Sequence, residues 1–258
     1  MFESLTYAAH NRTAVITLNR PDKRNALNGP LVEELTNAFD RAANDADVKV
    51  VQLRANGNVF SAGADLDYLQ RLQTNSYDEN LDDSKRLAAL FRSIAALPKP
   101  VIACVQGAAI AGGCGLASVC DFSIAASDAK FGYTESRIGF VPAIVMIFLL
   151  RKIGDTRARD LMLTGRLIDA NEAERIGLIT KAVDKDIFES EIQALTDILL
   201  NDTSSQSLAA IKNMALSVSD MPLDAALQYA AETNAAARSS EDCKRGIAAF
   251  LAKEKIRW

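Results

Sequence analysis

The sequence predicts an α/β fold, in which a core of alternating strands and helices is followed by a helical C-terminal region. Two patterns carry this prediction. Short apolar runs of strand length alternate with amphipathic segments of helical period in the first half of the chain, and helical periodicity dominates from residue 141 onward. The composition agrees, because 258 residues with 49% hydrophobic and 24% charged amino acids can bury a large core without disulfides or a structural metal.

The first third of the chain has a strand, helix, strand rhythm. Apolar runs at 14–18 and 48–53 have the length and composition of buried strands. Between them, hydrophobic residues recur at helical spacing from Leu31 to Ala42, with Asn28 placed to cap the helix and Pro30 in its first turn. This order predicts a βαβ arrangement.

A second round of the same pattern follows. Apolar positions at helical spacing run through 81–97, and Pro98 and Pro100 end that helix. The uninterrupted apolar run at 101–105 predicts a strand buried on both faces, and 121–126 is another short strand candidate. The spacing favours repeated strand-strand-helix units stacked around one core.

The C-terminal half is predicted to be mainly helical. Gly154, Gly165 and Gly177 stand where helix C-caps are needed, and Asp169 can cap the helix that follows it. Long periodic segments then follow at 187–201, 204–217 and 222–251. Since no Pro/Ser-rich linker interrupts the chain, two independent domains are not expected.

Charge and hydropathy exclude several classes of function. Lys and Arg number 29 against 33 Asp and Glu, a net charge of −4 without a basic block, so we expect no nucleic-acid partner. The longest apolar stretches, at 101–110 and 143–150, are far shorter than the ~20 residues that span a bilayer, and the N-terminus lacks the apolar core of a signal peptide. We therefore expect a cytoplasmic protein with no membrane partner.

Cysteine and histidine chemistry has little support in the sequence. The four cysteines, in a chain without a secretory signal, are expected to be reduced thiols. The single histidine, His10, has no partnering motif, so histidine-dependent triads and metal sites are not expected. Any chemistry must therefore use carboxylates, backbone dipoles or a cofactor.

Two segments rich in small residues, 60–69 and 106–121, each follow a predicted strand. If a helix begins at each, its first N–H groups are unpaired and form a site for a negatively polarised oxygen. Two such groups on one carbonyl oxygen make an oxyanion hole. The alternative is that glycine and alanine only permit close packing of helix and sheet. Neither segment has the spacing of a phosphate-binding loop or a dinucleotide turn.

Glu135 is a third candidate, because it lies in an otherwise apolar neighbourhood between Phe131 and Phe140. Burial raises the pKa of a glutamate toward the range in which it transfers protons near neutral pH. The alternative is an exposed carboxylate paired with Arg137.

Six segments, taken together, have a recognisable order and spacing over nearly the whole chain. They are PDKRNALN at 21–28, FSAGADL at 60–66, KPVIACVQGAAIAGGCGLA at 99–117, CDFSIAA at 120–126, FGYTESRIGFVPA at 131–143 and LTGRLIDANEAERIGLI at 163–179. In this combination the chain resembles the crotonase superfamily, also called the enoyl-CoA hydratase/isomerase family. The resemblance implies a crotonase (ClpP-like) fold: a spiral of ββα units over 1–195, a helical trimerisation region over 196–258, and a homotrimer or a dimer of trimers.

The resemblance also implies the substrate and the site. The substrate is an acyl-CoA thioester, so coenzyme A is part of the substrate, and neither a separate cofactor nor a metal is expected. The backbone N–H groups of Ala62 and Gly112 are implied to hold the thioester oxygen, and Glu135 to transfer protons. Contacts with coenzyme A are implied for Lys23, Arg24, Asn25, Ala26, Ala62, Gly63, Ala64, Asp65, Leu66, Gly112 and, across a subunit interface, Phe250 and Lys253.

One position departs from the family pattern. Typical hydratases carry two glutamates, and here the first of these positions is Gly115 while the second is Glu135. A single carboxylate can shuttle one proton between two carbons, which favours a Δ3,Δ2-enoyl-CoA isomerase. The segments around both positions, however, resemble a branch grouped with the hydratases. A hydratase that adds water to a 2-enoyl-CoA, in fatty-acid or branched-chain acyl-CoA metabolism, is therefore placed ahead of the isomerase, and a non-catalytic binder of acyl-CoA or RNA is a third alternative.

Overall fold

The computed structural model describes residues 2–258 and contains a six-stranded and a four-stranded sheet. The larger sheet consists, in spatial order, of β1 (Leu5–His10), β2 (Thr13–Leu18), β3 (Val50–Ala55), β5 (Val101–Val105), β7 (Phe122–Ala126) and β10 (Lys181–Val183). The smaller sheet consists of β4 (Val59–Ser61), β6 (Ala108–Ile110), β8 (Lys130–Gly132) and β9 (Ile168–Asp169).

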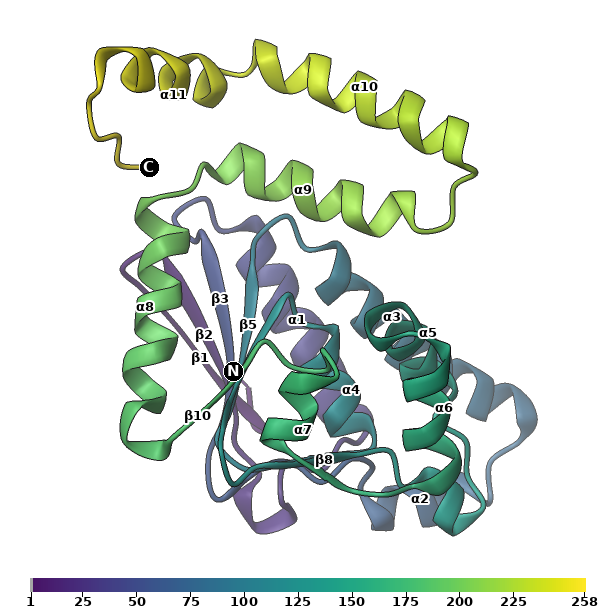
Figure 1. Cartoon of the computed structure of the whole chain (residues 1–258). Coiled ribbons are helices and arrows are strands. Elements are labelled where there is room, and N and C mark those ends of the chain that lie inside the picture. The colour runs from purple at the N-terminus through teal and green to yellow at the C-terminus, as the bar shows by residue number, and fades with distance from the viewer. Residues whose placement is uncertain (1) are drawn as a thin grey trace.

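Helices surround these sheets on several sides (Figure 1). They are α1 (Gly29–Asn44), α2 (Leu66–Leu72), α3 (Tyr77–Ala96), α4 (Gly112–Val119), α5 (Ala143–Ile153), α6 (Asp155–Thr164), α7 (Ala170–Arg175), α8 (Phe188–Asn201), α9 (Ser205–Val218), α10 (Leu223–Ser239) and α11 (Glu241–Ala252).

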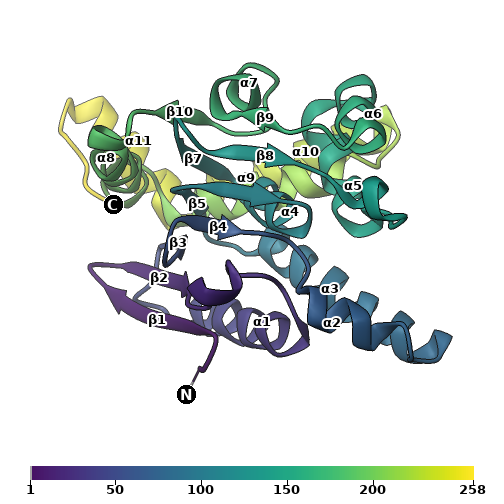
Figure 2. The ribbon, with the colours of Figure 1, turned by 90° about the horizontal axis from the view of Figure 1, so that it is seen from below.

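Each turn of the fold places one strand in each sheet and then continues into a helix. β3 is followed by β4, β5 by β6 and β7 by β8, and the first strand of each pair lies in the larger sheet while the second lies in the smaller. Parallel pairing stacks successive turns, with Val51 of β3 opposite Val101 of β5, and Figure 2 shows the strands following one another from the β1–β2 hairpin toward α7. The structure confirms the spiral of ββα units.

The signals at helix ends act as predicted. The Asn28 side chain accepts a hydrogen bond from the N–H of Leu31 at 3.0 Å at the start of α1, and Asp169 caps α7 in the same way. Gly154 and Gly165 end α5 and α6 with φ values of 77° and 61°. Such positive φ values are strained for residues with a Cβ atom, which explains glycine at these stops.

The strand β1 was not anticipated from the sequence. It pairs antiparallel with β2, from Leu5 opposite Leu18 to His10 opposite Thr13. Only Leu5 of this strand is buried, so the alternation of apolar and polar residues that reveals a strand is weak here.

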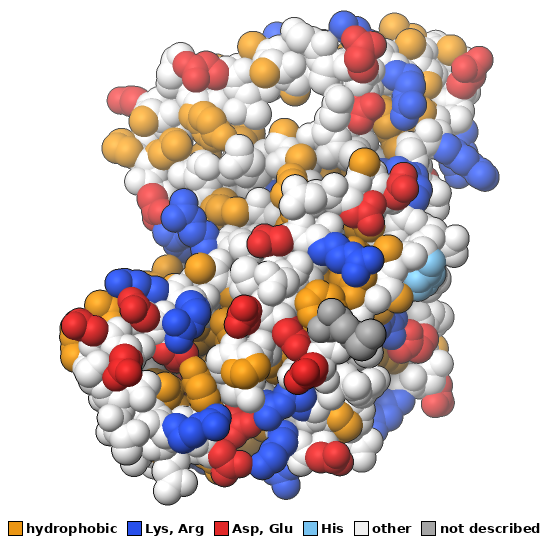
Figure 3. Space-filling view, turned by 180° about the vertical axis from the view of Figure 1, so that it is seen from behind, with side chains coloured by type: hydrophobic (Ala, Val, Ile, Leu, Met, Phe, Trp, Pro, Cys, Tyr) orange, Lys and Arg blue, Asp and Glu red, His pale blue; other side chains and the backbone are white. Residues whose placement is uncertain are grey.

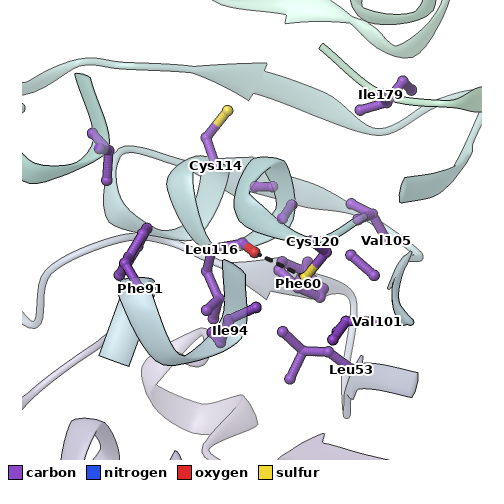
Figure 4. Close-up of a cluster of buried hydrophobic side chains, with 14 of the residues drawn as sticks. Leu53, Phe60, Phe91, Ile94, Val101, Val105, Cys114, Leu116, Cys120 and Ile179 are labelled. Atoms are coloured by element: carbon purple, nitrogen blue, oxygen red, sulfur yellow. Dashed lines mark hydrogen bonds between the residues drawn. The ribbon is translucent and has the colours of Figure 1, made fainter. Parts of the chain in front are cut away.

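The central strands of the larger sheet lie between two helical layers. Every residue of β5 is buried, as its uninterrupted apolar run predicts. Ile102 and Cys104 belong to a hydrophobic cluster with residues of α8, whereas Val101 and Val105 belong to a larger cluster with residues of α1, α3 and α4. Figure 4 shows part of the larger cluster, in which Leu116 of α4 lies among apolar side chains of neighbouring elements. The core thus holds α4 in place.

The helices α9, α10 and α11 lie beyond the end of the larger sheet (Figure 1). None of their residues, all of which the structure describes, is buried. α9 is tied to the core by Lys212, whose amine contacts the Asp121 carboxylate at 2.5 Å. The segment 222–251 is two helices, because Ser240 is extended and caps α11. The boundary expected at residue 195 falls inside α8.

The molecular surface carries charges of both signs. Lys and Arg side chains alternate with Asp and Glu side chains over the face shown in Figure 3. Among the described helices, none combines the length and the apolar character needed to cross a membrane.

Candidate active site

Three segments singled out from the sequence meet at one edge of the smaller sheet. β4 pairs with β6 and β6 with β8, all in parallel, so the residues that follow these strands emerge on the same side. The N–H of Ala111 donates to the carbonyl of Gly132 at 2.7 Å, which joins the start of α4 to the strand that leads to Glu135. The predicted residues at 62–66, Gly112 and Glu135 therefore belong to one region.

Ala111 turns the chain from β6 into α4 through a strained backbone. Its φ is 52° and its ψ is −124°, a conformation that costs a residue with a Cβ atom about 1–3 kcal/mol. This turn leaves the N–H of Gly112, the first residue of α4, without an acceptor anywhere in residues 2–258. Gly112 is half-buried, and the helix dipole adds positive potential at its N–H. We therefore retain Gly112 as a candidate oxyanion donor.

Gly63 brings the other small-residue segment against this turn. Its φ is 87°, and a Cβ atom on it would lie 2.7 Å from the Cβ of Ala111 and 3.4 Å from the nitrogen of Gly112. A Cβ atom on Gly113 would lie 2.4 Å from the carbonyl oxygen of Ser61. The two backbones are thus in direct contact, and glycine is required at both positions.

The N–H of Ala62, which was predicted as the second oxyanion donor, already has an acceptor in this structure. This N–H donates to the carbonyl of Arg24 at 3.0 Å. The same pairing continues at Leu27. Its N–H donates to the carbonyl of Gly63 at 2.6 Å, and its carbonyl accepts the N–H of Asp65 at 2.8 Å. Within the described chain the N–H of Ala64 has no acceptor, and this residue is half-buried. Ala64, predicted only as a coenzyme A contact, is the better candidate donor.

Glu135 begins a 3₁₀ helix, Glu135–Ile138, directly after β8. Its exposed fraction is 8%, and its Oε2 atom is buried without a hydrogen-bond partner among residues 2–258. Burial raises the pKa of this carboxyl, and its own backbone amide opposes the rise. A buried carboxyl with a raised pKa and an unused oxygen is suited to proton transfer.

Gly115, which the resemblance aligns with the first glutamate of typical hydratases, is buried in α4. The atoms nearest to a Cβ placed there belong to Val145 of α5 and to Phe91 of α3. The site is therefore apolar at this position, and Glu135 is the carboxylate that the sequence pattern leaves.

Two of the side chains implied to contact coenzyme A are exposed cations. Lys23 and Arg24 lie at the surface, a few residues before Leu27, which pairs with residues 63–65. A hydrogen bond to Asp67 raises the pKa of Lys23, with a distance of 2.8 Å between the amine and the carboxylate. Both side chains can meet phosphate groups without the cost of burial.

Asn25 and Asp65 have structural roles instead. Asn25 is fully buried, and its amide donates to the carbonyls of Asn56 and Val59 at 2.8 Å each. Asp65 caps α2 and contacts Arg20 at 2.8 Å. Burial acts to raise the pKa of Asp65, but Arg20 and the capped amides together lower it. Both side chains already have hydrogen-bond partners within the chain, so we expect any contact with a ligand to use their backbone atoms.

The remaining implied contacts are separated in space. Ala26 is buried, whereas Leu66 is exposed beside the Ala64 segment. Phe250 and Lys253 end α11, at the opposite end of the molecule from α2 (Figure 1). Within one chain they do not approach the site, and their contact across a subunit interface stays a prediction.

The cysteines near the site are inert. Burial raises the pKa of Cys104, Cys114 and Cys120 to about 12, so these thiols stay protonated at neutral pH. Asp121, next to Cys120, accepts the N–H of Val101 at 2.7 Å and has the structural role expected from the sequence. The group of small residues therefore contributes backbone donors rather than side-chain nucleophiles.

Comparison with known proteins identifies one family over nearly the whole chain. The sequence model described as enoyl-CoA hydratase/isomerase matches residues 8–258. A Thermus thermophilus protein that bears an enoyl-CoA hydratase name is 39% identical over 95% of this chain and 96% of its own. A crotonyl-CoA hydratase of Syntrophomonas wolfei is 34% identical over 98% of this chain and 97% of its own.

A solved structure shares the whole fold. The crystal structure of an enoyl-CoA hydratase from Shewanella pealeana superposes with a TM-score of 0.94, at 31% identity, and covers 100% of this chain and 96% of its own. The family match and the structural match together extend over the spiral core and the C-terminal helices. The chain belongs to the enoyl-CoA hydratase/isomerase family.

Proposed function

We propose that the protein is an enoyl-CoA hydratase, which adds water to the double bond of a 2-enoyl-CoA thioester. One observation carries this proposal: the N–H groups of Ala64 and Gly112, which have no acceptor among residues 2–258, lie on touching segments, and the Ala111–Gly132 hydrogen bond joins these to the strand that leads to Glu135, a buried carboxyl with an unpartnered oxygen. Backbone donors suit a thioester oxygen, and the carboxyl suits a water molecule.

The backbone donors act on charge that develops during the reaction. When water adds at C3 of the enoyl group, negative charge moves through C2 to the thioester oxygen. The N–H groups of Ala64 and Gly112 stabilise this enolate-like state, and one such donor contributes about 3–4 kcal/mol in comparable sites. Because the two donors are fixed before the substrate binds, little reorganisation is needed at the moment of reaction.

Glu135 handles the protons. As a carboxylate it takes a proton from the attacking water, whose oxygen bonds to C3, and a proton is then delivered to C2, so that one water is added across the double bond. The raised pKa of Glu135 makes both the removal and the return of a proton accessible near neutral pH.

The names of the relatives support hydration. A crotonyl-CoA hydratase and a short-chain-enoyl-CoA hydratase of Clostridium acetobutylicum are each 34% identical to this chain over at least 95% of its length. We propose acyl-CoA thioesters as the substrate class and coenzyme A as part of the substrate, with no separate cofactor.

The isomerase is the second candidate, because Gly115 leaves a single carboxylate at the site. Glu135 alone can remove a proton from C2 of a 3-enoyl-CoA and return it to C4, which moves the double bond without water.

The test is turnover of a 2-enoyl-CoA panel and, separately, of a 3-enoyl-CoA panel, followed by the absorbance of the conjugated thioester. A hydratase lowers the absorbance of the first panel and forms 3-hydroxyacyl-CoA, whereas an isomerase raises that of the second alone.

Glu135→Gln is expected to lower kcat by about 10²-fold or more while thioester binding survives. Glu189→Gln, at an exposed carboxylate on α8, is the matched control. If the wild-type protein binds the thioesters but turns over neither panel, it is a non-catalytic binder.

We also propose a cytoplasmic homotrimer or a dimer of trimers. Its support within the chain is the set of exposed apolar side chains on the unburied C-terminal helices: Ile211, Leu223, Leu227, Ile247, Phe250 and Leu251. Such side chains mark a surface that another subunit covers. Light scattering after gel filtration gives the mass, and a mass of one chain at micromolar concentration would contradict this proposal.

A further inference from the structure

Lys152 reaches from α5 to the carboxyl end of α4. Its amine donates to the carbonyl of Ser118 at 2.6 Å and to that of Cys120 at 3.1 Å. These carbonyls lie where α4 ends, and the last turn of α4 contains no basic residue of its own. A residue of another helix thus satisfies orphan carbonyls that every helix end exposes and places a cation at the negative end of the helix dipole.

The same end of α4 is connected to the strand that leads to Glu135. The hydroxyl groups of Ser118 and Tyr133 lie 3.2 Å apart, both buried. Lys152 therefore anchors the last turn of α4, where Ser118 contacts Tyr133, two residues before Glu135. The first turn of α4 presents the Gly112 N–H. The helix is only eight residues long, so a displacement at one end moves the other.

We propose that Lys152 is a positioning residue for the reaction: it fixes α4 from its carboxyl end, so that the Gly112 N–H stays aimed at the thioester oxygen. The inference rests on the proposed function of this site. A backbone donor has no side chain with which to adjust its position, and misplacement of a reacting group by about 1 Å costs about 10²-fold in rate.

The surroundings of Lys152 agree with an ordered cation. Burial lowers the pKa of its amine, and the neighbouring Cys120, Asp121 and Cys114 act in the opposite direction. The two thiols are protonated, which leaves Asp121 as the anion among these neighbours. The amine is thus held mainly by the carbonyls of α4, as a positioning role requires.

Lys99 offers a matched control within the same chain. Its amine donates to the carbonyls of Ala42 and Asp45, at 2.7 and 2.6 Å, at the carboxyl end of α1. The contact geometry and the lowered pKa match those of Lys152, but α1 does not present the Gly112 donor. Loss of this lysine removes a helix cap without touching α4.

The experiment compares Lys152→Met, Lys152→Arg and Lys99→Met by steady-state kinetics and by hydrogen exchange of the peptide that spans 112–119. Lys152→Met is expected to lower kcat about tenfold or more with KM within about twofold, and to speed exchange in 112–119. Lys152→Arg, which keeps a charged donor, should restore most of kcat. Lys99→Met should lose stability while its kcat stays within about twofold of the wild type.

Three results would overturn the inference: an unchanged kcat in Lys152→Met, an equal fall in Lys99→Met, or unchanged exchange in 112–119. The two proposals fail separately. If the wild-type protein turns over neither enoyl-CoA panel, the proposed function fails, and the exchange of 112–119 in Lys152→Met against Lys152→Arg then decides the positioning role by itself.

Discussion

Gly115 of α4 and Val145 of α5 share one side-chain volume. A Cβ atom placed on Gly115 would lie 2.2 Å from Cγ1 and 2.8 Å from Cβ of Val145, far closer than two carbon atoms can approach. On the remaining side Phe91 would be 3.1 Å away. The space beside Gly115, where the resemblance implies a glutamate in typical hydratases, is thus filled from the facing helix.

This relationship predicts that Gly115→Ala destabilises the protein even though alanine is the better helix former. Overpacking of a buried contact costs about 1–3 kcal/mol, and an approach of 2.2 Å places Gly115→Ala at the upper end of that range. The cost then exceeds the gain of about 1 kcal/mol from replacing glycine in a helix. Urea unfolding should therefore show a lower free energy of unfolding. In a protein that already carries Val145→Gly, the further loss caused by Gly115→Ala should be smaller by more than 1 kcal/mol. A double-mutant cycle measures this difference as a coupling energy, and additive effects would contradict the shared volume.

The raised pKa of Glu135 predicts a stability difference that depends on pH. A carboxyl whose pKa is raised on folding stabilises the folded state below its unfolded pKa, and this contribution is lost as pH rises through the folded pKa. Glu135→Gln cannot ionise, so it should melt at a higher temperature than the wild type at pH about 8, and the gap should close near pH about 4.

Thermal unfolding at the two pH values measures this difference. Each kcal/mol gained in the free energy of unfolding raises the melting temperature by about 2–4 °C in a chain of this size. The exposed control Glu189→Gln should show no such gain at pH about 8. A Glu135→Gln variant that melts below the wild type at that pH would show that the carboxylate is stabilised, rather than strained, in its site.

The strained turn at Ala111 gives a third prediction. Because its φ of 52° is more readily adopted by glycine, Ala111→Gly should raise the free energy of unfolding by about 1 kcal/mol, even after the greater freedom of glycine in the unfolded chain is counted. Ala109→Gly, in the buried strand β6, is the control and should lower it. Chemical denaturation of the three proteins makes the comparison, and a loss of stability in Ala111→Gly would contradict strain at this turn.

Local signals in the sequence located most of the fold. Asn28, Asp169 and Gly165 each act on the few residues around them: Asn28 and Asp169 begin α1 and α7, and Gly165 ends α6, where the sequence predicts. The run at 101–105 predicted its strand residue by residue, because a strand buried on both faces has no polar positions to obscure it. By contrast β1, exposed on most of its length, left no such pattern.

The site was harder to predict because its details depend on contacts between distant segments. Ala62 and Ala64 are equivalent in composition, and only the pairing with Arg24 and Leu27 decides which N–H is left over. Asp65 looks like a ligand contact in sequence, yet Arg20 uses its carboxylate. Without the fold, no property of these residues distinguishes a binding group from a structural one.

The correction from Ala62 to Ala64 can be tested by removing one N–H group at a time. Replacement of an alanine by lactic acid during translation changes its backbone N–H to an ester oxygen and leaves the side chain intact. At Ala64 this should lower kcat by about 10²–10³-fold, the usual cost of one oxyanion donor. The unfolding free energy should change little, since this N–H has no acceptor within the described residues.

The same replacement at Ala62 is the matched control, because each ester also weakens the carbonyl that precedes it. Here the hydrogen bond to Arg24 is lost, so the unfolding free energy should fall by about 1 kcal/mol while kcat stays within a few-fold of the wild type. Kinetics and urea unfolding of both esters separate the two roles. If the ester at Ala62 instead abolished turnover and that at Ala64 did not, the backbone donor would have to be Ala62, and the pairing with Arg24 would have to open when substrate binds.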